Sequence, residues 1–261
     1  MTVVPRPAAP ALLLAALLAL GAPGAAFADT IRLRADEWCP YNCAPGSEMP
    51  GYGVEVMREV FAQAGHTVDY GLLTWSRSIE DARGGRHDAI IGAIPAEAPG
   101  FVFPEEPIGA SGEGYAVRRG TDFRYTGPGS LAGKVLGSVS GYAYGGDIGA
   151  YVEAHKGDRS KVQLTSGDDA LAQSLKKLVA GRLDVVIDDA NVLAHVIADL
   201  GLCERVVIAD KGTPAKIYVA FSPACPKAKE YAALLSEGVA RLRSSGRLAE
   251  ILSRYDVRDW R

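Results

Sequence analysis

One short pattern occurs twice in this chain. Residues 85–92 read GRHDAIIG, and residues 181–188 read GRLDVVID. In both places a charged, helix-compatible stretch leads into Gly–Arg, which is typical of a helix end, because Gly accepts the left-handed cap and a cation suits the helix dipole there. The β-branched apolar run that follows is too continuous for a half-exposed strand and predicts a parallel strand buried on both faces. The chain therefore contains the same helix–turn–strand unit twice.

Two such units predict a binding cleft. In an open α/β sheet, ligands lie beyond the carboxyl ends of the strands. Two lobes built this way would direct Gly92 and the Asp188–Asp189 pair toward a shared cleft. The alternative at this point is that two α/β domains merely share a common pattern of helix end and strand.

The alternation of helical and strand patterns along the chain predicts the α/β class. Two crossings, near residues 113–120 and 214–221, would form a two-stranded hinge. We expect one lobe to hold residues 29–115 and 220–261, and the other to hold residues 116–219. Predicted helices cover residues 54–65, 76–85, 145–157, 168–181, 189–201 and 225–256, and predicted strands cover residues 30–38, 66–73, 87–94, 112–119, 134–141, 205–210 and 216–223.

The N-terminus reads as a secretory signal peptide over residues 1–28. Arg6 supplies a positive start, an apolar run follows, and Ala26-Phe27-Ala28 is a small-x-small cleavage site. The apolar run is about a dozen residues, shorter than the ~20 that span a bilayer. We expect a mature chain that begins near Asp29 and is exported to the periplasm as a soluble protein.

The four cysteines suit an oxidising compartment. Four cysteines allow three pairings. We favour Cys39 with Cys43 and Cys203 with Cys225, because the other two pairings would tie distant segments together. The C-x3-C spacing around Pro40 and the scattered histidines do not favour a metal site.

Composition and motifs exclude several classes of function. The net charge of −3 and the absence of a basic cluster argue against nucleic-acid binding. Residues 137–141 read GSVSG, with Val139 where a nucleophile elbow needs Ser. Residues 127–132 read GPGSLA, but Pro128 and the turn-rich approach do not suit a dinucleotide fold. We expect no catalytic residues, no cofactor and no metal.

Aromatic residues stand at several predicted loop ends, where ligand contacts gather. Their flat rings offer apolar faces and cation–π contacts, although core packing is an equal alternative for any one of them. These residues are Trp38, Tyr41, Trp75, Tyr115, Tyr142 and Tyr144.

Residues 35–65, followed by W-x-R-x-I at 75–79 and GRHDAIIGA at 85–93, resemble the family 3 extracellular solute-binding proteins. The resemblance covers nearly the whole mature chain, from Ile31 through the C-terminal helices. It implies two Rossmann-like lobes of the type 2 periplasmic binding fold, closure on a small polar ligand, and delivery to a membrane ABC permease. Members most often bind amino acids.

The resemblance also implies site residues. The first-lobe aromatic of the family falls on Trp38, and the lid segment falls near Leu73 to Arg77. The second-lobe loop falls on Gly141-Tyr142-Ala143. The aspartate that meets a ligand ammonium in amino-acid binders falls on Asp189.

One departure concerns the ligand. In amino-acid binders a T-x-x-R segment supplies the arginine that pairs the α-carboxylate in two parallel hydrogen bonds. Here residues 92–100 contain neither Arg nor Lys. Either Arg77 substitutes for that arginine, or the ligand has no carboxylate and Asp188, Asp189 and the aromatics bind an amine or another cation.

We therefore predict a monomeric, non-catalytic periplasmic binding protein for a small molecule. Two alternatives remain: a periplasmic enzyme of the same fold resembling cyclohexadienyl dehydratase, with Glu97, Glu113 and Asp189 as candidate acid–base groups, or a binding module that acts in trans with a sensor or periplasmic enzyme. The predicted ligand-binding residues are Trp38, Tyr41, Trp75, Arg77, Gly92, Tyr115, Tyr142 and Asp189.

Overall fold

A computed structural model describes residues 1–3, 28–167 and 169–261. Residues 4–27 of the predicted signal peptide lie outside this described part. Within the described residues, every helix is too short or too polar to span a bilayer.

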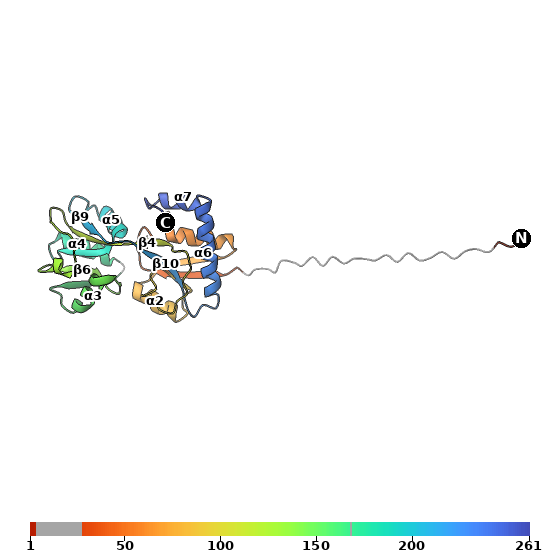
Figure 1. The fold of residues 1–261 in the computed structure, drawn as a ribbon, viewed down its shortest axis with the longest axis horizontal. Coiled ribbons are helices and arrows are strands. Elements are labelled where there is room, and N and C mark those ends of the chain that lie inside the picture. Colours follow the sequence, from red (N-terminus) through yellow and green to blue (C-terminus); the bar gives the residue numbers. More distant parts are fainter. Residues whose placement is uncertain (4–27, 168) are drawn as a thin grey trace.

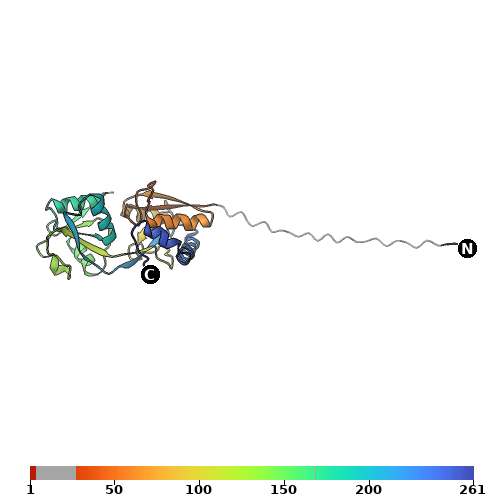
Figure 2. The same ribbon diagram turned by 90° about the horizontal axis from the view of Figure 1, so that it is seen from above.

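The described residues form two five-stranded sheets, each in a lobe of its own, and the lobes lie side by side (Figures 1 and 2). The first sheet has the order β2-β1-β3-β10-β4 and contains β1 (Thr30–Ala35), β2 (Thr67–Leu72), β3 (Ala89–Ala93), β4 (Gly109–Ser111) and β10 (Ala215–Phe221). The helices of this lobe are α1 (Tyr52–Gln63), α2 (Trp75–Arg83), α6 (Ala228–Ser244) and α7 (Arg247–Ser253).

The second sheet has the order β7-β6-β8-β5-β9. Its strands are β5 (Glu113–Arg118), β6 (Leu136–Val139), β7 (Val162–Thr165), β8 (Val185–Asp189) and β9 (Val206–Lys211). This lobe also holds α3 (Gly146–His155), α4 (Ala170–Val179), α5 (Ala190–Asp199) and the 3-10 helix η1 (Pro128–Leu131). In each sheet three parallel strands are joined by an antiparallel strand that comes from a crossing segment. The α/β class and the two-lobed architecture are thus as predicted.

The chain passes between the lobes at two places that touch each other. Gly112 separates β4 from β5, and residues 212–214 separate β9 from β10. A Cβ atom built on Gly112 would lie 3.2 Å from the Gly212 oxygen and from Pro214, so the two crossings pack backbone against backbone. The lobes therefore change at residue 112 and at residues 212–214, whereas we placed these boundaries after residues 115 and 219.

The repeated sequence pattern forms the same local structure in both lobes. Gly85 follows α2 with φ 78°, and Gly181 follows α4 with φ 73°. In both turns the amide of the next residue, Arg86 or Arg182, bonds back to a carbonyl five residues earlier, at 2.9 Å. This is the bonding of a Schellman helix end. The strands that follow, β3 and β8, occupy the third place in their sheets, and both are almost entirely buried.

Local sequence explains the first lobe's core. Along β1 the alternate residues Ile31, Leu33 and Ala35 are buried, as period-2 patterning requires. On α1 the apolar face centred on Met57 and Val60 is fully buried.

The C-terminal segment packs on this first lobe, as expected. It forms two helices and not one long helix, because Gly246 adopts φ 82° between α6 and α7. Val60 of α1 lies against Gly238 of α6, where a side chain would collide with it.

The predicted Cys203–Cys225 disulfide is wrong in this structure, in which both residues are free thiols. We favoured this pair because the two residues flank a strand-loop-strand pattern and the other pairings would tie more distant segments together. The strands between them, β9 and β10, instead carry the chain from one lobe to the other and lie in different sheets. Cys203 therefore precedes β9 in the second lobe, and Cys225 follows β10 in the first. The other predicted pair, Cys39–Cys43, is a disulfide.

Candidate ligand-binding cleft

A cavity of about 500 Å³ lies between the lobes. Segments following β1, β3 and β6 and the last two residues of β8 contribute to its walls, so the carboxyl ends of parallel strands from both sheets meet there. The repeated units contribute Gly92 from the first lobe and Asp188 and Asp189 from the second, as the sequence predicted.

Aromatic rings form much of the wall. Trp38 and Trp75 line the cavity from the first lobe, and Tyr115 and Tyr142 line it from the second. Tyr115 stacks on Tyr125 with ring centroids 4.5 Å apart and planes 9° apart. These four predicted ligand-binding residues are thus brought together at one cavity, along with Tyr144.

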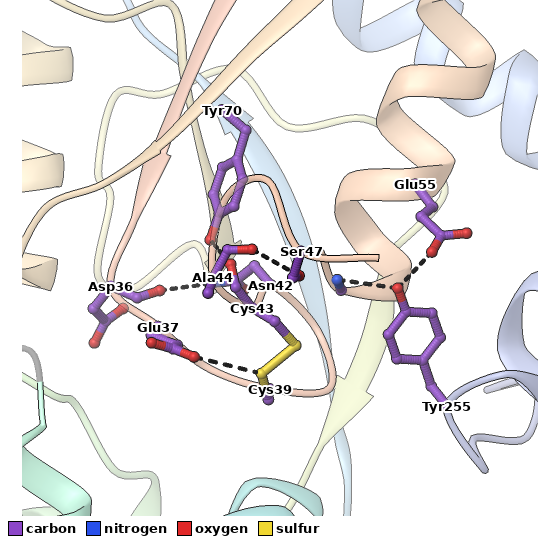
Figure 3. Close-up of a disulfide and its surroundings, with 11 residues drawn as sticks. Asp36, Glu37, Cys39, Asn42, Cys43, Ala44, Ser47, Glu55, Tyr70 and Tyr255 are labelled. Atoms are coloured by element: carbon purple, nitrogen blue, oxygen red, sulfur yellow. Dashed lines mark hydrogen bonds between the residues drawn. A yellow bond between two sulfur atoms is a disulfide. The ribbon is translucent and has the colours of Figure 1, made fainter. Parts of the chain in front are cut away.

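Trp38 begins a tightly held turn, residues 38–43. The Cys39–Cys43 disulfide closes this loop (Figure 3). The Trp38 amide donates to the Asn42 carbonyl at 2.7 Å. The Tyr70 hydroxyl donates to the Cys43 carbonyl at 2.9 Å, which anchors the loop to β2. The indole ring of Trp38 is thereby fixed at the rim of the cleft.

Gly92 lies directly beneath this ring. A Cβ atom built there would meet Trp38 ring carbons at 3.4–3.5 Å, and the residue has φ 93°. Both the close approach and the left-handed backbone favour glycine.

Tyr41 supports the cleft from behind. It is 1% exposed and is not among the residues lining the cavity, although we predicted it as a ligand contact. Its ring stacks on Trp38 with centroids 4.4 Å apart. Its hydroxyl lies 3.1 Å from Asp189 Oδ2 and accepts a hydrogen bond from Asn191 at 3.0 Å. Tyr41 thus connects the first lobe to the start of α5.

Asp189 reaches the cavity wall with both carboxylate oxygens already hydrogen-bonded. Oδ1 accepts the amides of Asn191 at 2.8 Å and Val192 at 3.0 Å, which makes Asp189 the N-cap of α5. Oδ2 accepts the Gly112 amide at 3.0 Å at the hinge, besides its contact with Tyr41. Burial raises the pKa of this carboxyl. Asp189 therefore ties a helix start to the hinge, a role that its place after the repeated motif did not suggest.

Asp188 accepts fewer hydrogen bonds from the described residues than Asp189 does. It is 1% exposed, and its Oδ1 accepts the Trp38 indole N–H at 3.1 Å and the Asp189 amide at 2.7 Å. Burial, with the nearby Asp189 and Asp36 carboxylates, raises the pKa of Asp188 to about 7. The Trp38 bond joins the two lobes across the cleft.

Further hydrogen bonds link the lobes at the same level. The Tyr142 hydroxyl donates to Asp36 Oδ2 at 2.6 Å, and the Ala143 amide donates to Glu97 Oε1 at 3.1 Å. The Ile94 amide donates to the other Glu97 oxygen at 3.3 Å, and burial raises the pKa of Glu97. The lobes are therefore in contact in this structure, with the cavity enclosed between them.

Arg77 does not contribute to the cavity wall. Its guanidinium pairs with Asp81 at 2.8 Å on α2, its side chain is 58% exposed, and it does not line the cavity. The i,i+4 spacing of the two residues explains this pairing. The structure therefore does not support Arg77 as the substitute for the missing arginine.

Residues 32–257 match the bacterial extracellular solute-binding proteins, family 3. The chain belongs to this family. No curated protein sequence matches it significantly.

Solved structures share the fold of this family 3 protein. A histidine kinase sensor domain similar to periplasmic binding proteins is 24% identical, with 87% of this chain and 95% of that chain covered and a TM-score of 0.70. A structure from glutathione import through GshT and the cystine ABC importer TcyBC of Streptococcus mutans is 18% identical, with 87% and 95% covered and a TM-score of 0.71. The ancestral amino-acid-binding protein AncCDT-1, a precursor of cyclohexadienyl dehydratase, is 18% identical, with the same coverage and a TM-score of 0.65.

The cavity of this family 3 protein contains acidic residues that sequence reasoning missed. Asp36 follows β1, Asp147 begins α3, and Asp210 lies near the end of β9. Each of the three lies at the end of a strand or the start of a helix that faces the cleft. This position was the sequence signal that could have identified them as cavity residues. Together with Glu97, Glu113, Asp188 and Asp189 they face a single basic residue of the lining, Lys211.

Proposed function

We propose that this protein captures a small polar solute between its lobes outside the cytoplasm and delivers it to an ABC-type transporter. The cavity enclosed by both lobes carries this proposal. Its volume of about 500 Å³ is that of a typical small-molecule site, and its walls combine aromatic rings with a few polar groups. The predicted signal peptide supports a periplasmic location.

Capture would proceed by closure of the lobes about the two crossings at residues 112 and 212–214. In the open state Trp38, Trp75 and Gly92 would offer a half-site on the first lobe. Closure would then add Tyr142 and Asp188 and form the hydrogen bonds that link the lobes. Because Asp189 bonds to the hinge at Gly112 and to Tyr41 behind Trp38, hinge rotation and cleft assembly are mechanically coupled.

Fluorescence and uptake test this proposal in two steps. Closure buries Trp38 and Trp75 further, so solute released from natively purified protein should change the tryptophan emission when added back to the solute-free mature chain. Cells lacking the gene should then lose uptake of that solute. An unchanged emission would contradict capture in the cleft, and normal uptake in the deletion strain would favour a sensor partner, as in the histidine kinase relative.

An enzyme of the same fold is the second candidate, and Glu97 favours it. Burial raises the pKa of this carboxyl, which suits a general acid, and Glu97 lines the cavity. Against this role, both of its oxygens already accept backbone amides, from Ala143 and Ile94. We therefore expect no turnover when prephenate is incubated with the purified protein, and product formation that Glu97→Gln abolishes would establish the enzyme instead.

A further inference from the structure

We propose that the solute is an organic cation with two positively charged centres and no carboxylate, a diamine in the simplest case. This inference rests on the proposed function, because it assigns a ligand class to the same cavity. It follows from the charge of the walls, from how the acidic residues are distributed along them, and from which carboxylate oxygens remain available.

The charge of the walls excludes an anionic ligand group. Among the described residues, six of the seven lining carboxylates form no salt bridge, and the one lining cation, Lys211, lies exposed at the end of β9. A ligand carboxylate would be buried among like charges without a cationic partner, which costs several kcal/mol. A ligand cation would instead gain favourable charge interactions with these six residues: Glu97, Glu113, Asp147, Asp188, Asp189 and Asp210.

The acids form two groups at different places in the cavity. One group centres on Asp188 at the end of β8, which interacts electrostatically with Asp36 and Asp189. The other includes Asp210 near the end of β9 and Asp147 at the start of α3, which both bond to Tyr125. Strand β5 lies between β8 and β9, so two strand spacings, about 10 Å, separate the groups across the sheet.

Each group has carboxylate oxygens available to a ligand. Asp188 is 1% exposed, yet its Oδ2 receives no hydrogen bond from the described residues, while Oδ1 receives two. In the second group, Asp147 accepts the Tyr125 hydroxyl through Oδ1 at 2.9 Å, and its Oδ2 likewise receives none from the described part of the chain. The buried Asp188 needs a donor for Oδ2, whereas Asp147 is exposed and its Oδ2 can exchange water for a ligand group; an ammonium supplies three donors.

Aromatic surface occupies the space between the groups. Tyr144 lines the cavity and contacts both regions: its hydroxyl lies 3.4 Å from the carbonyl of Ile187, the neighbour of Asp188, and the amide of the next residue, Gly145, donates to Glu113 Oε1 at 3.2 Å. Trp38 flanks the Asp188 end, to which it donates its indole N–H, while the stacked Tyr115–Tyr125 pair flanks the other. This arrangement suits a ligand whose apolar linker lies along the rings and whose two cationic ends each make a cation–π contact.

Calorimetric titration of the mature protein with three matched five-carbon probes tests the inference. The probes are 1,5-diaminopentane, n-pentylamine and pentanedioate. We expect the diamine to bind at least tenfold more tightly than the monoamine, and pentanedioate to give no binding heat. Equal affinity for the two amines, or binding of pentanedioate, would overturn the inference.

Two variants assign the ends of the ligand. Asp147→Asn keeps an acceptor for the Tyr125 hydroxyl but removes a charge, so it should weaken the diamine at least fivefold and leave n-pentylamine unchanged. Asp188→Asn should weaken both amines. Asp158→Asn is the matched control, because Asp158 is an exposed second-lobe carboxylate that bonds to Ser160 outside the cleft. Circular dichroism of each variant shows whether it is folded, and equal losses in all three would contradict the two-ended site.

The chemical identity of the solute released from natively purified protein distinguishes a failure of this inference from a failure of the proposed function. An anion, a zwitterion or a neutral solute would overturn the dication while leaving capture in the cleft intact. Absence of any bound solute, with no response to the three probes, would count against both.

Discussion

At the scale of single residues, Asp188 is a buried acid of the cavity wall whose ionisation should respond to what fills the cavity. Burial raises its pKa to about 7 from an ordinary value of 3.8. Between these values the folded protein holds a proton that the unfolded chain releases, so the free energy of unfolding falls as pH rises toward 7 and is level above it. A nearby ligand cation favours the ionised form and so lowers this pKa.

Asp188→Asn should remove most of this pH dependence in the solute-free protein. Between pH 4.5 and 7.5 the wild type should lose about 3 kcal/mol of unfolding free energy that the variant keeps. Urea unfolding at the two pH values measures the difference. Parallel loss in the two proteins would mean that Asp188 ionises at its ordinary pKa. Glu97 and Asp189, whose pKa values burial also raises, contribute with the same sign to both proteins.

Two substitutions on α2 compare a residue that lines the cavity with one that lies on the surface. Trp75→Leu keeps an apolar side chain but removes a ring that lines the cavity, so affinity for the released solute should fall about 3- to 30-fold, the range of a cation–π contact. Arg77→Ala, two residues along, should leave the affinity unchanged, because Arg77 pairs with Asp81 outside the cavity. Weaker binding by the Arg77 variant would restore it as a ligand contact.

At the scale of elements, the loop of residues 38–43 matters most, because it fixes Trp38 and Tyr41 together. The hydrogen bond from the Trp38 amide to the Asn42 carbonyl holds it, together with the Tyr70 contact and the disulfide that Figure 3 shows. A loop this short gains modest stability from a crosslink, roughly 2 kcal/mol on the chain-entropy model.

The double variant Cys39→Ser/Cys43→Ser should therefore lose about 2 kcal/mol of unfolding free energy. It should also bind the released solute more weakly, since Trp38 becomes free to move away from Asp188. Cys203→Ser, at an exposed free thiol of the other lobe, should change neither quantity. Denaturant unfolding and fluorescence titration measure both. An unchanged affinity in the double variant would show that hydrogen bonds alone position the loop.

Elements with strong local signals could be predicted from the sequence. The two Gly–Arg helix ends and the buried strands after them form where predicted, because cap geometry and apolar runs are local properties. Strand β7 was missed: it has four residues, lies at a sheet edge and takes its stability from pairing with β6. The break at Gly246 was also missed, since the apolar pattern continues across it.

At the scale of the whole molecule, the two-lobed architecture was predictable because the chain repeats one unit and belongs to a recognisable family. The contacts between residues far apart in the sequence could not be predicted. Cys203 and Cys225 looked like neighbours in sequence, yet they belong to opposite lobes. Asp189 was predicted as a ligand contact and lines the cavity, but the bonds of its oxygens to the α5 cap and the hinge could not be predicted. Which acids share the cavity depends on how the two sheets face each other, and no local pattern encodes that.

The most direct test of capture in the cleft is mass spectrometry of small molecules released when the protein, purified from native cells without refolding, is unfolded. Wild-type protein should release close to one equivalent of a positively charged solute. The double variant Trp75→Leu/Asp188→Asn, altered on both sides of the cavity, should release far less. Recovery of no solute from the wild type, or of equal amounts from both proteins, would contradict the account.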